Sequence, residues 1–297
     1  MGSDRHYPEE APARRTQVGQ FDIDETAVTN RAFAQFVAAT GYVTVAERPP
    51  DPAHYPGAPA HLLVPGSLVF RMTAGPVDLR DVRNWWAWTP GASWRHPEGP
   101  DSTLRGRKDH PVVHVAFEDA AAFAEWAGKD LPTEAEWEFA ARGGLDAAEF
   151  AWGDELMPKG RHMANTWQGE FPWQNLATDG FPGTCPVKSF RPNGYGLFEM
   201  CGNVWEWTSD EFAIRTPTDD VTLETRNSCC ADNGASHFDD LNGLEHLATR
   251  IPQKVVKGGS FLCTTSYCRR YRPAARHAQM VDSGMSHIGF RCVRKPQ

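Results

Sequence analysis

The spacing of apolar residues predicts a helix near the start of the chain. Phe33, Phe36 and Val37 are spaced so that they share one face of a helix. Thr29 is suited to the start of this helix, because its hydroxyl can accept a hydrogen bond from a free backbone N–H. Gly41 is suited to its end, because glycine readily takes the left-handed conformation that closes many helices. We therefore expect a helix between these two residues.

A second helix is predicted in the segment FEDAAAFAEWAG, residues 117–128. Phe117, Ala121 and Ala124 have the spacing of a buried helix face. Gly128 marks the expected end.

A third helix is predicted in PTEAEWEFAARGG, where Thr133 and Glu136 have the spacing of a capping box and Gly143 closes the segment. Short runs rich in β-branched and aromatic residues predict strands elsewhere. These runs are HPVVHVAF (110–117), KVVKGGSFL (254–262) and IGFRCVRK (288–295).

Beyond about residue 144 the sequence has almost no helical periodicity. The chain contains 26 Gly, 23 Pro and 11 Trp, a mixture that indicates irregular backbone packed around large rings. Long loops inside a compact domain are usually functional or held by something besides side-chain packing, such as bound ions. The polar stretch 214–253 is interpreted as a surface insertion. No linker divides the chain, so residues 1–297 are expected to form a single domain.

Charge and hydropathy exclude several classes of protein. The formal net charge of −8 argues against general nucleic-acid binding, which needs a basic face. No segment approaches the roughly 20 apolar residues of a membrane helix, so no membrane partner is expected. The first residues, MGSDRHYPEEAPARR, have no apolar core and do not resemble a secretory signal. These features favour a cytoplasmic location, where thiols stay reduced.

The cysteines give the strongest indication of chemistry. There are seven, at 185, 201, 229, 230, 263, 268 and 292, and no two form a C-x-x-C. An odd number argues against a disulfide framework, and the spacing argues against a zinc ribbon. Cys263 and Cys268 are separated by four residues, and arginines follow at once. From spacing alone, this pair is a structural disulfide, a metal clip or a pair of reactive thiols.

Five motifs occur in a fixed order along the chain, and the fourth contains the cysteine pair. They are HPVVHVAFEDAAAFAEWAGKDLPTEAEWEFAARGG, ANTWQGEFP, NGYGLFEMCGNVWEWTSD, KGGSFLCTTSYCRRYRPAAR and GFRC. Together they resemble the formylglycine-generating enzymes, the sulfatase-modifying factors. LPTEAEWE, GNVWEW and GFRC are shared with a wider superfamily, whereas the cysteine block points to the oxidase itself. The resemblance implies a single compact, irregular α+β domain, a variant of the C-type-lectin fold with little regular secondary structure.

The resemblance also implies an activity. Family members convert the cysteine of a Cys-x-Pro-x-Arg motif in an unfolded or nascent sulfatase to Cα-formylglycine, with molecular oxygen as co-substrate and an external thiol reductant. The expected cofactor is copper(I), held by Cys263 and Cys268, because soft thiolates select this ion and zinc has no redox chemistry. Arg269 and Arg270 could favour the thiolate form if they face it.

Other side chains in the cysteine motifs have open roles. Ser260 and Tyr267 resemble positions that line the family's active site, although each could simply satisfy a strand end. The adjacent Cys229 and Cys230 have no counterpart in the family pattern. They could relay electrons to the copper pair or be an exposed, incidental feature.

Two calcium sites are implied by matched loop segments, because calcium prefers oxygen ligands on irregular backbone. The first set would use the side chains of Asn165 and Asp179 with the carbonyls of Thr166 and Phe181. The second would use the carboxylates of Glu199 and Glu206 with the carbonyls of Gly202 and Val204. The alternative is that these carboxylates form salt bridges or caps on a solvated loop.

A peptide groove is also implied, with Trp85, Arg276 and His287 as substrate-binding residues. The alternatives are core packing for Trp85 and a structural ion pair for Arg276.

Two other functions are open for the protein as a whole. One is a lectin-like binding module, since some superfamily relatives lack the cysteines. The other is an iron-dependent sulfoxide synthase, which would need a histidine-rich helical motif that does not occur here.

Overall fold

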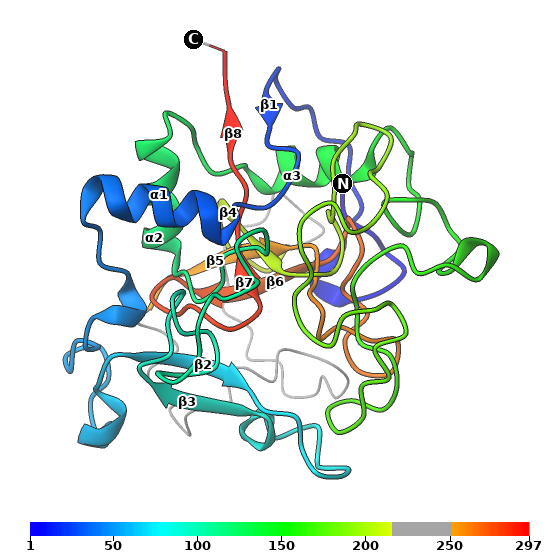
Figure 1. The fold of residues 1–297 in the computed structure, drawn as a ribbon. Helices are drawn as coiled ribbons and strands as arrows, with labels where there is room; N and C mark the ends of the chain where they lie inside the picture. The colour runs from blue at the N-terminus through cyan, green and yellow to red at the C-terminus, as the bar shows by residue number, and fades with distance from the viewer. Residues whose placement is uncertain (216–250, 297) are drawn as a thin grey trace, which may run out of the picture.

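A four-stranded sheet lies at the centre of the structure, a computed structural model that describes residues 1–215 and 251–296 (Figure 1). Its strand order is β6-β5-β4-β7. The antiparallel neighbours β4, β5 and β6 are joined by β7, which runs parallel to β4. The four strands are β4 (Trp205–Glu211), β5 (Gln253–Lys257), β6 (Arg276–Met280) and β7 (Ile288–Gly289).

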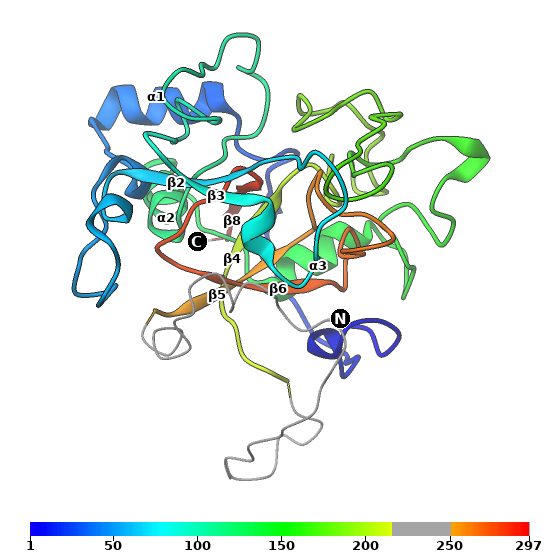
Figure 2. The same cartoon turned by 90° about the horizontal axis from the view of Figure 1, so that it is seen from below.

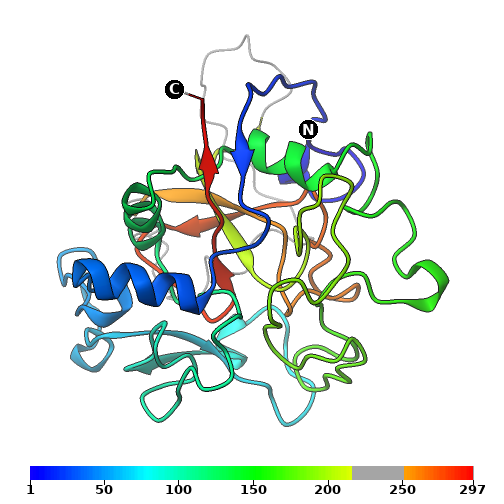
Figure 3. The same cartoon turned by 45° about the horizontal axis from the view of Figure 1, so that its top comes forward.

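Two small antiparallel sheets flank the central one. β2 (Gly66–Phe70) pairs with β3 (Trp86–Pro90), and β1 (Asp22–Ile23) pairs with β8 (Val293–Arg294). The view from below places the β2–β3 pair in front, and the tilted view shows β1 beside β8 (Figures 2 and 3). Within the described residues, five single-turn 3₁₀ helices connect these pieces: η1 (Pro8–Glu10), η2 (Val45–Glu47), η3 (Ala60–Leu62), η4 (Val82–Asn84) and η5 (Pro158–Gly160).

The first and third predicted helices are confirmed with their caps. In α1 (Asn30–Thr40) the Thr29 hydroxyl accepts from the Ala32 N–H at 3.2 Å, and Gly41 closes the helix in the left-handed conformation. In α3 (Glu134–Arg142) the predicted capping box forms, and Gly143 ends the helix in the same way. α3 packs against β4 and β5, whereas α1 and α2 lie together on the other side of the sheet (Figure 1).

The second helix, α2 (Phe117–Trp126), forms where it was predicted, but its buried face is partly different. Phe123 and Ala124 are buried, whereas Phe117 and Ala121 are only half-buried. Phe117 lies at the rim of the core, edge-on to Trp207 with ring centroids 5.8 Å apart. Sequence spacing located the helix but did not fix its rotation against the sheet.

One of the three strand predictions is wrong, and the other two are right over only part of their length. HPVVHVAF forms no strand, because His114 takes a positive φ of 60° and interrupts the extended backbone. IGFRCVRK is divided into β7 and β8, which pair with different sheets. KVVKGGSFL begins as β5 and ends at Lys257, because Gly258 and Gly259 turn the chain with φ of 95° and 70°.

The second half of the described chain is irregular, as predicted. Between α3 and β4 the only helical turn is η5, and these loops lie on the side of the sheet opposite α1 and α2 (Figures 1 and 3). The predicted insertion at 214–253 lies almost wholly outside the described residues, and so do Cys229 and Cys230. Within the described part of the chain, no helix is long and apolar enough to cross a membrane.

A buried ionic cluster joins α3 to the central sheet. The ammonium of Lys257 on β5 lies 3.1 Å from the Glu138 carboxylate on α3, and both side chains are fully buried. Burial alone would raise the pKa of Glu138, but the positive charges of Lys257 and Arg142 outweigh it and lower the pKa to about 2. Glu138 is therefore ionised at neutral pH, and its charge depends on these partners.

We expect Lys257→Met to lower the free energy of unfolding by about 3–5 kcal/mol, because it leaves a buried carboxylate without its main partner. Urea denaturation at neutral pH measures this loss. The exposed pair of Lys188 and Glu25 is the matched control, and Lys188→Met should change the free energy by less than about 1 kcal/mol. Equal effects of the two substitutions would contradict a structural role for the buried cluster.

Candidate active site

The loop that follows β5 brings Cys263 and Cys268 together. Gly259 allows the sharp turn into this loop, since a Cβ at this position would lie 2.8 Å from the backbone nitrogen of Tyr271. Two reciprocal backbone hydrogen bonds between Thr264 and Cys268, each 3.1 Å, then close the loop. The two thiols consequently face each other across a closed turn.

The two sulfur atoms are in contact but not bonded. Their Sγ atoms are 3.2 Å apart, well beyond the roughly 2.05 Å of a disulfide, and both thiols are free. The Ser260 N–H donates to the Cys263 sulfur at 3.4 Å. Burial raises the pKa of Cys263, whereas a hydrogen bond from Cys263 and the nearby Arg270 charge lower the pKa of Cys268. Cys268 is therefore the more readily ionised of the two thiols, and the two sulfur atoms form a contact and not a disulfide bond.

Only one of the two neighbouring arginines faces the cysteines. Nη1 of Arg270 lies 3.9 Å from the Cys268 sulfur. Arg269 points elsewhere and pairs with Glu149 at 3.1 Å. The expectation that both guanidinium groups could favour the thiolate therefore holds for Arg270 alone.

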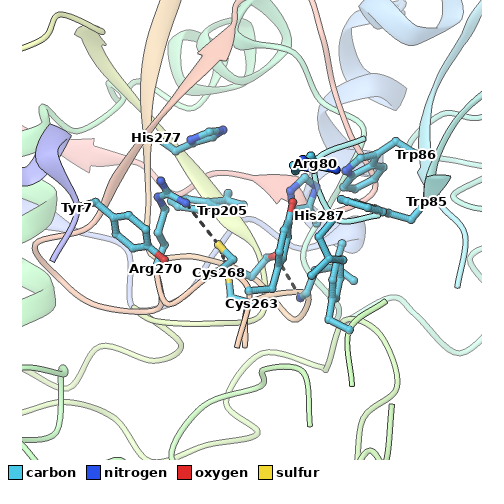
Figure 4. Close-up of a pocket in the computed structure, with 15 residues that line it drawn as sticks. Tyr7, Arg80, Trp85, Trp86, Trp205, Cys263, Cys268, Arg270, His277 and His287 are labelled. Atoms are coloured by element: carbon cyan, nitrogen blue, oxygen red, sulfur yellow. Dashed lines mark hydrogen bonds between the residues drawn. The ribbon is translucent and has the colours of Figure 1, made fainter. Parts of the chain in front are cut away.

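The cysteine pair lines a cavity of about 220 Å³ that is walled mainly by aromatic rings (Figure 4). On one wall Tyr267 stacks on Phe171 with ring centroids 4.5 Å apart, and Trp85 meets both rings edge-on. Trp85 is buried, as the core-packing alternative expects, and it also lines the cavity, so its role in substrate binding stays a prediction. The remaining lining residues are Tyr7, Leu79, Arg80, Trp86, Trp205, Ser260, Leu262, Arg270, His277 and His287.

Of the other two groove residues, the structure places His287 at the cavity and Arg276 away from it. His287 packs on Trp86 with ring centroids 4.8 Å apart, and its Nδ1 has no hydrogen-bond partner among the described residues. Burial lowers the pKa of His287 to about 3, so its ring is neutral at neutral pH. Arg276 is not a lining residue. It is buried in an ion pair with Glu134 at 3.0 Å, so its assignment to the groove is wrong and the structural alternative holds.

Sequence reasoning missed several lining residues. Trp205 stood inside the quoted GNVWEW motif and Trp86 stood next to Trp85, so motif membership could have indicated the first and sequence adjacency the second. Tyr7 gave no such signal. It reaches the site from the N-terminal segment, where its hydroxyl accepts from the Arg269 N–H at 2.9 Å. Figure 4 shows Tyr7 with Arg270 on one side of the cysteines, and Trp85, Trp86 and His287 on the other.

The first predicted calcium set is gathered in one loop cluster. The Asp179 carboxylate accepts from the backbone N–H groups of Thr166 and Phe181, at 3.1 and 3.0 Å. Oδ1 of Asn165 is buried without a hydrogen-bond partner among the described residues. A buried, unpaired amide oxygen is the kind of ligand that calcium binds, so Asn165 fits the ion, whereas the Thr166 carbonyl and the Asp179 carboxylate also accept from the side-chain amide of Gln168.

The second predicted set fits a cation poorly. The Glu206 carboxylate is paired with Arg291 at 2.7 and 2.9 Å, and it also accepts from the Trp137 indole. The Glu199 oxygens accept from the backbone N–H groups of Lys188 and Phe190. The salt-bridge and capping alternative describes both carboxylates. The assignment of the Gly202 and Val204 carbonyls as calcium ligands stays a prediction.

Comparison with known proteins gives one consistent result. Residues 1–296 match the family model described as the sulfatase-modifying factor enzyme 1-like domain. The formylglycine-generating enzyme of Mycobacterium tuberculosis is 53% identical, over 100% of this chain and 94% of its own length. That of Thermomonospora curvata is 46% identical, over 98% of this chain and 88% of its own. A mouse protein named inactive C-alpha-formylglycine-generating enzyme 2 is 37% identical over 96% of this chain and 78% of its own.

Solved structures agree on the fold. PvdO from Pseudomonas aeruginosa superposes with a TM-score of 0.58, covering 100% of this chain and 90% of its own, at 21% sequence identity. The predicted α+β class with little regular secondary structure is confirmed. By its family model and its relatives, the chain belongs to the family of formylglycine-generating enzymes, the sulfatase-modifying factors.

Proposed function

We propose that this protein is a copper-dependent oxidase that converts the cysteine of a Cys-x-Pro-x-Arg motif to Cα-formylglycine, using molecular oxygen. Its substrate would be an unfolded or nascent sulfatase. The observation that carries the proposal is the contact of two free thiols, 3.2 Å apart, at the wall of an aromatic cavity. One relative in the family is named inactive, so family membership alone does not establish activity. The proposal therefore depends on the cysteine pair.

The rival functions have less support. A lectin-like binding module has no need of paired thiols in a cavity. A sulfoxide synthase needs an iron site, and among the described residues no group of three or more His, Cys, Asp and Glu side chains is arranged to hold a metal.

The overall reaction balances with one further reductant. The substrate side chain loses a C–H bond and its C–S bond, gains an aldehyde oxygen, and releases its sulfur as hydrogen sulfide. The substrate provides two electrons to oxygen, and an external thiol reductant provides two more, so that the oxygen molecule is reduced to the level of water. One of the two water molecules is consumed when the oxidised carbon is hydrolysed.

Cys263 and Cys268 fit copper(I), because two soft sulfur donors in contact suit a soft ion of low coordination number. When bound, copper(I) would supply the one-electron chemistry that ground-state oxygen requires. The chain's own residues would stabilise the thiolate, exclude water and bind the peptide. Arg270 would favour the negative charge on Cys268, and the rings of Trp85, Phe171 and Tyr267 would exclude water and hold the apolar part of the peptide.

His287 completes this arrangement. Its neutral ring and unpaired Nδ1 offer one hydrogen-bonding position at the cavity wall. A peptide amide or hydroxyl entering the cavity would satisfy this atom, which would otherwise stay buried without a partner.

Calcium is proposed at the first loop site only. Asn165 and Asp179 would provide side-chain oxygens, and Thr166 and Phe181 would provide carbonyl oxygens. Support comes from the unpaired oxygen of Asn165, next in sequence to Thr166, whose N–H donates to the Asp179 carboxylate. The site would hold irregular loops together, away from the reaction.

We expect Cys263→Ser and Cys268→Ser each to abolish formation of the aldehyde while the protein stays folded, because each removes one of two soft donors. Mass spectrometry of a Cys-x-Pro-x-Arg peptide measures turnover, and circular dichroism measures folding. Cys201→Ala is the control, because Cys201 is a buried free thiol outside the cavity lining. Near-normal turnover in either serine variant would contradict the mechanism.

Trp85→Phe should raise the KM for the peptide by about three- to tenfold at similar kcat, because it removes part of an aromatic contact and keeps a ring in the core. Steady-state kinetics measure both constants. Arg276→Lys is the control for the corrected assignment, and it should lower the melting temperature without changing KM. A collapse of kcat at constant KM in Trp85→Phe would place this ring at the reaction centre instead.

Removal of calcium with a chelator should lower the melting temperature by about 5 °C or more, because an ion bound only to the native state stabilises it. Asp179→Asn should lose this response, whereas Glu199→Gln should keep it, because Glu199 caps backbone groups. Differential scanning calorimetry with and without chelator tests both variants. A response that Glu199→Gln loses and Asp179→Asn keeps would move the site to the second loop.

A further inference from the structure

The N-terminal segment covers the loop that carries the cysteines. Glu10 is fully buried and accepts from Nη1 and Nη2 of Arg272, which is also buried. Glu9 pairs with Arg270, and its backbone carbonyl accepts from Arg276 at 3.4 Å. Two of the arginines that follow Cys268, Arg270 and Arg272, are therefore paired with carboxylates more than 250 positions earlier in the chain.

Arg270 is fixed from two sides by this segment. Oε1 of Glu9 accepts from its Nη2 at 2.6 Å and from its Nε at 3.1 Å. The ring of Tyr7 lies against the guanidinium, with 3.8 Å between Cζ and the ring centroid. These contacts use the Nε–Nη2 edge and one face, and they direct the remaining nitrogen, Nη1, toward the Cys268 sulfur at 3.9 Å.

The neighbouring arginine pairs do not reach the cavity. Arg269 pairs with Glu149, which also binds His6 at 2.9 Å, so this contact likewise ties the loop to the N-terminal segment. Neither Glu149 nor Arg269 lines the cavity. Arg270 is the member of the arginine block that does, and Glu9 is its carboxylate partner.

We propose that Glu9 is a positioning residue for the oxidase, because it holds the Arg270 guanidinium in place beside the sulfur of Cys268. This inference rests on the proposed function. Glu9 does not line the cavity and acts through Arg270. A guanidinium so held presents a fixed positive charge to the anionic sulfur that would bind copper(I), without reorganising during turnover.

The test is Glu9→Gln, which keeps the size of the side chain and removes its charge. We expect kcat for a Cys-x-Pro-x-Arg peptide to fall about tenfold, because small displacements of a positioned group cost rate steeply, with KM within about twofold. The affinity of the metal-free protein for copper(I), measured by competition with a chromophoric chelator, should fall severalfold. This second measurement needs neither peptide nor oxygen.

The matched control is Glu149→Gln. It removes one carboxylate that ties the N-terminal segment to the same loop, next to an arginine that faces away from the cysteines. We expect kcat and copper(I) affinity within about twofold of the unaltered protein. If both variants behave alike in both measurements, Glu9 is only a structural link and the proposal is wrong.

Two further outcomes keep the test decisive. If Glu9→Gln does not fold, Arg270→Lys replaces it, because an ammonium cannot hold Glu9 and face Cys268 in the way a guanidinium fork does, and the same losses are expected. If the unaltered protein binds copper(I) but forms no aldehyde, the proposed function fails. The ratio of copper(I) affinities between Glu9→Gln and Glu149→Gln still supports or overturns the positioning role.

Discussion

The geometry of the cysteine pair depends on buried arginine–carboxylate pairs. The loop from Ser260 to Arg270 contains no helix or strand that could hold it. It is closed by its own backbone hydrogen bonds and anchored on the far side by Arg270 and Arg272. A buried guanidinium needs a carboxylate close by, and Glu9 and Glu10 provide one each. The N-terminal segment is therefore part of the active-site scaffold.

Other buried ion pairs also join distant segments of this irregular domain. Lys257 lies in the sheet and pairs with Glu138 and Glu134, and Arg291 binds Glu206 within the GNVWEW segment. Each pair joins segments that are far apart in sequence, and each is buried. Where helices and strands are short, these specific pairs fix the relative positions of segments that apolar packing alone would leave less defined.

The sequence predicted local features well, because their physics is local. The capping residues of α1 and α3 needed only neighbours three or four positions away, and both helices formed as expected. The strand prediction for HPVVHVAF failed because the positive φ of His114 is stabilised by distant partners, Ser67 and Pro97, which bind its ring. IGFRCVRK forms two strands because its two ends pair with different sheets, and a local sequence pattern does not show the partner of a strand.

For the site too, residues in short motifs could be predicted, whereas residues that depend on distant contacts could not. Cys263 and Cys268 could be singled out because they lie in one short motif. Trp85 and His287 could be placed through the family resemblance, whereas Arg276 was misassigned because position in a motif does not show which way a side chain points. Tyr7 and Glu9 could not be found, since their role depends on a contact across more than 250 residues.

The most direct measurement of the central claim uses one peptide. A Cys-x-Pro-x-Arg peptide is incubated with the protein, copper(I), a dithiol reductant and dissolved oxygen, and its mass is followed together with oxygen uptake. We expect a product lighter by the difference between a thiol-bearing CH₂ group and an aldehyde, with one oxygen molecule consumed for each peptide converted. An unchanged peptide, in a protein shown to bind both copper(I) and the peptide, would contradict it.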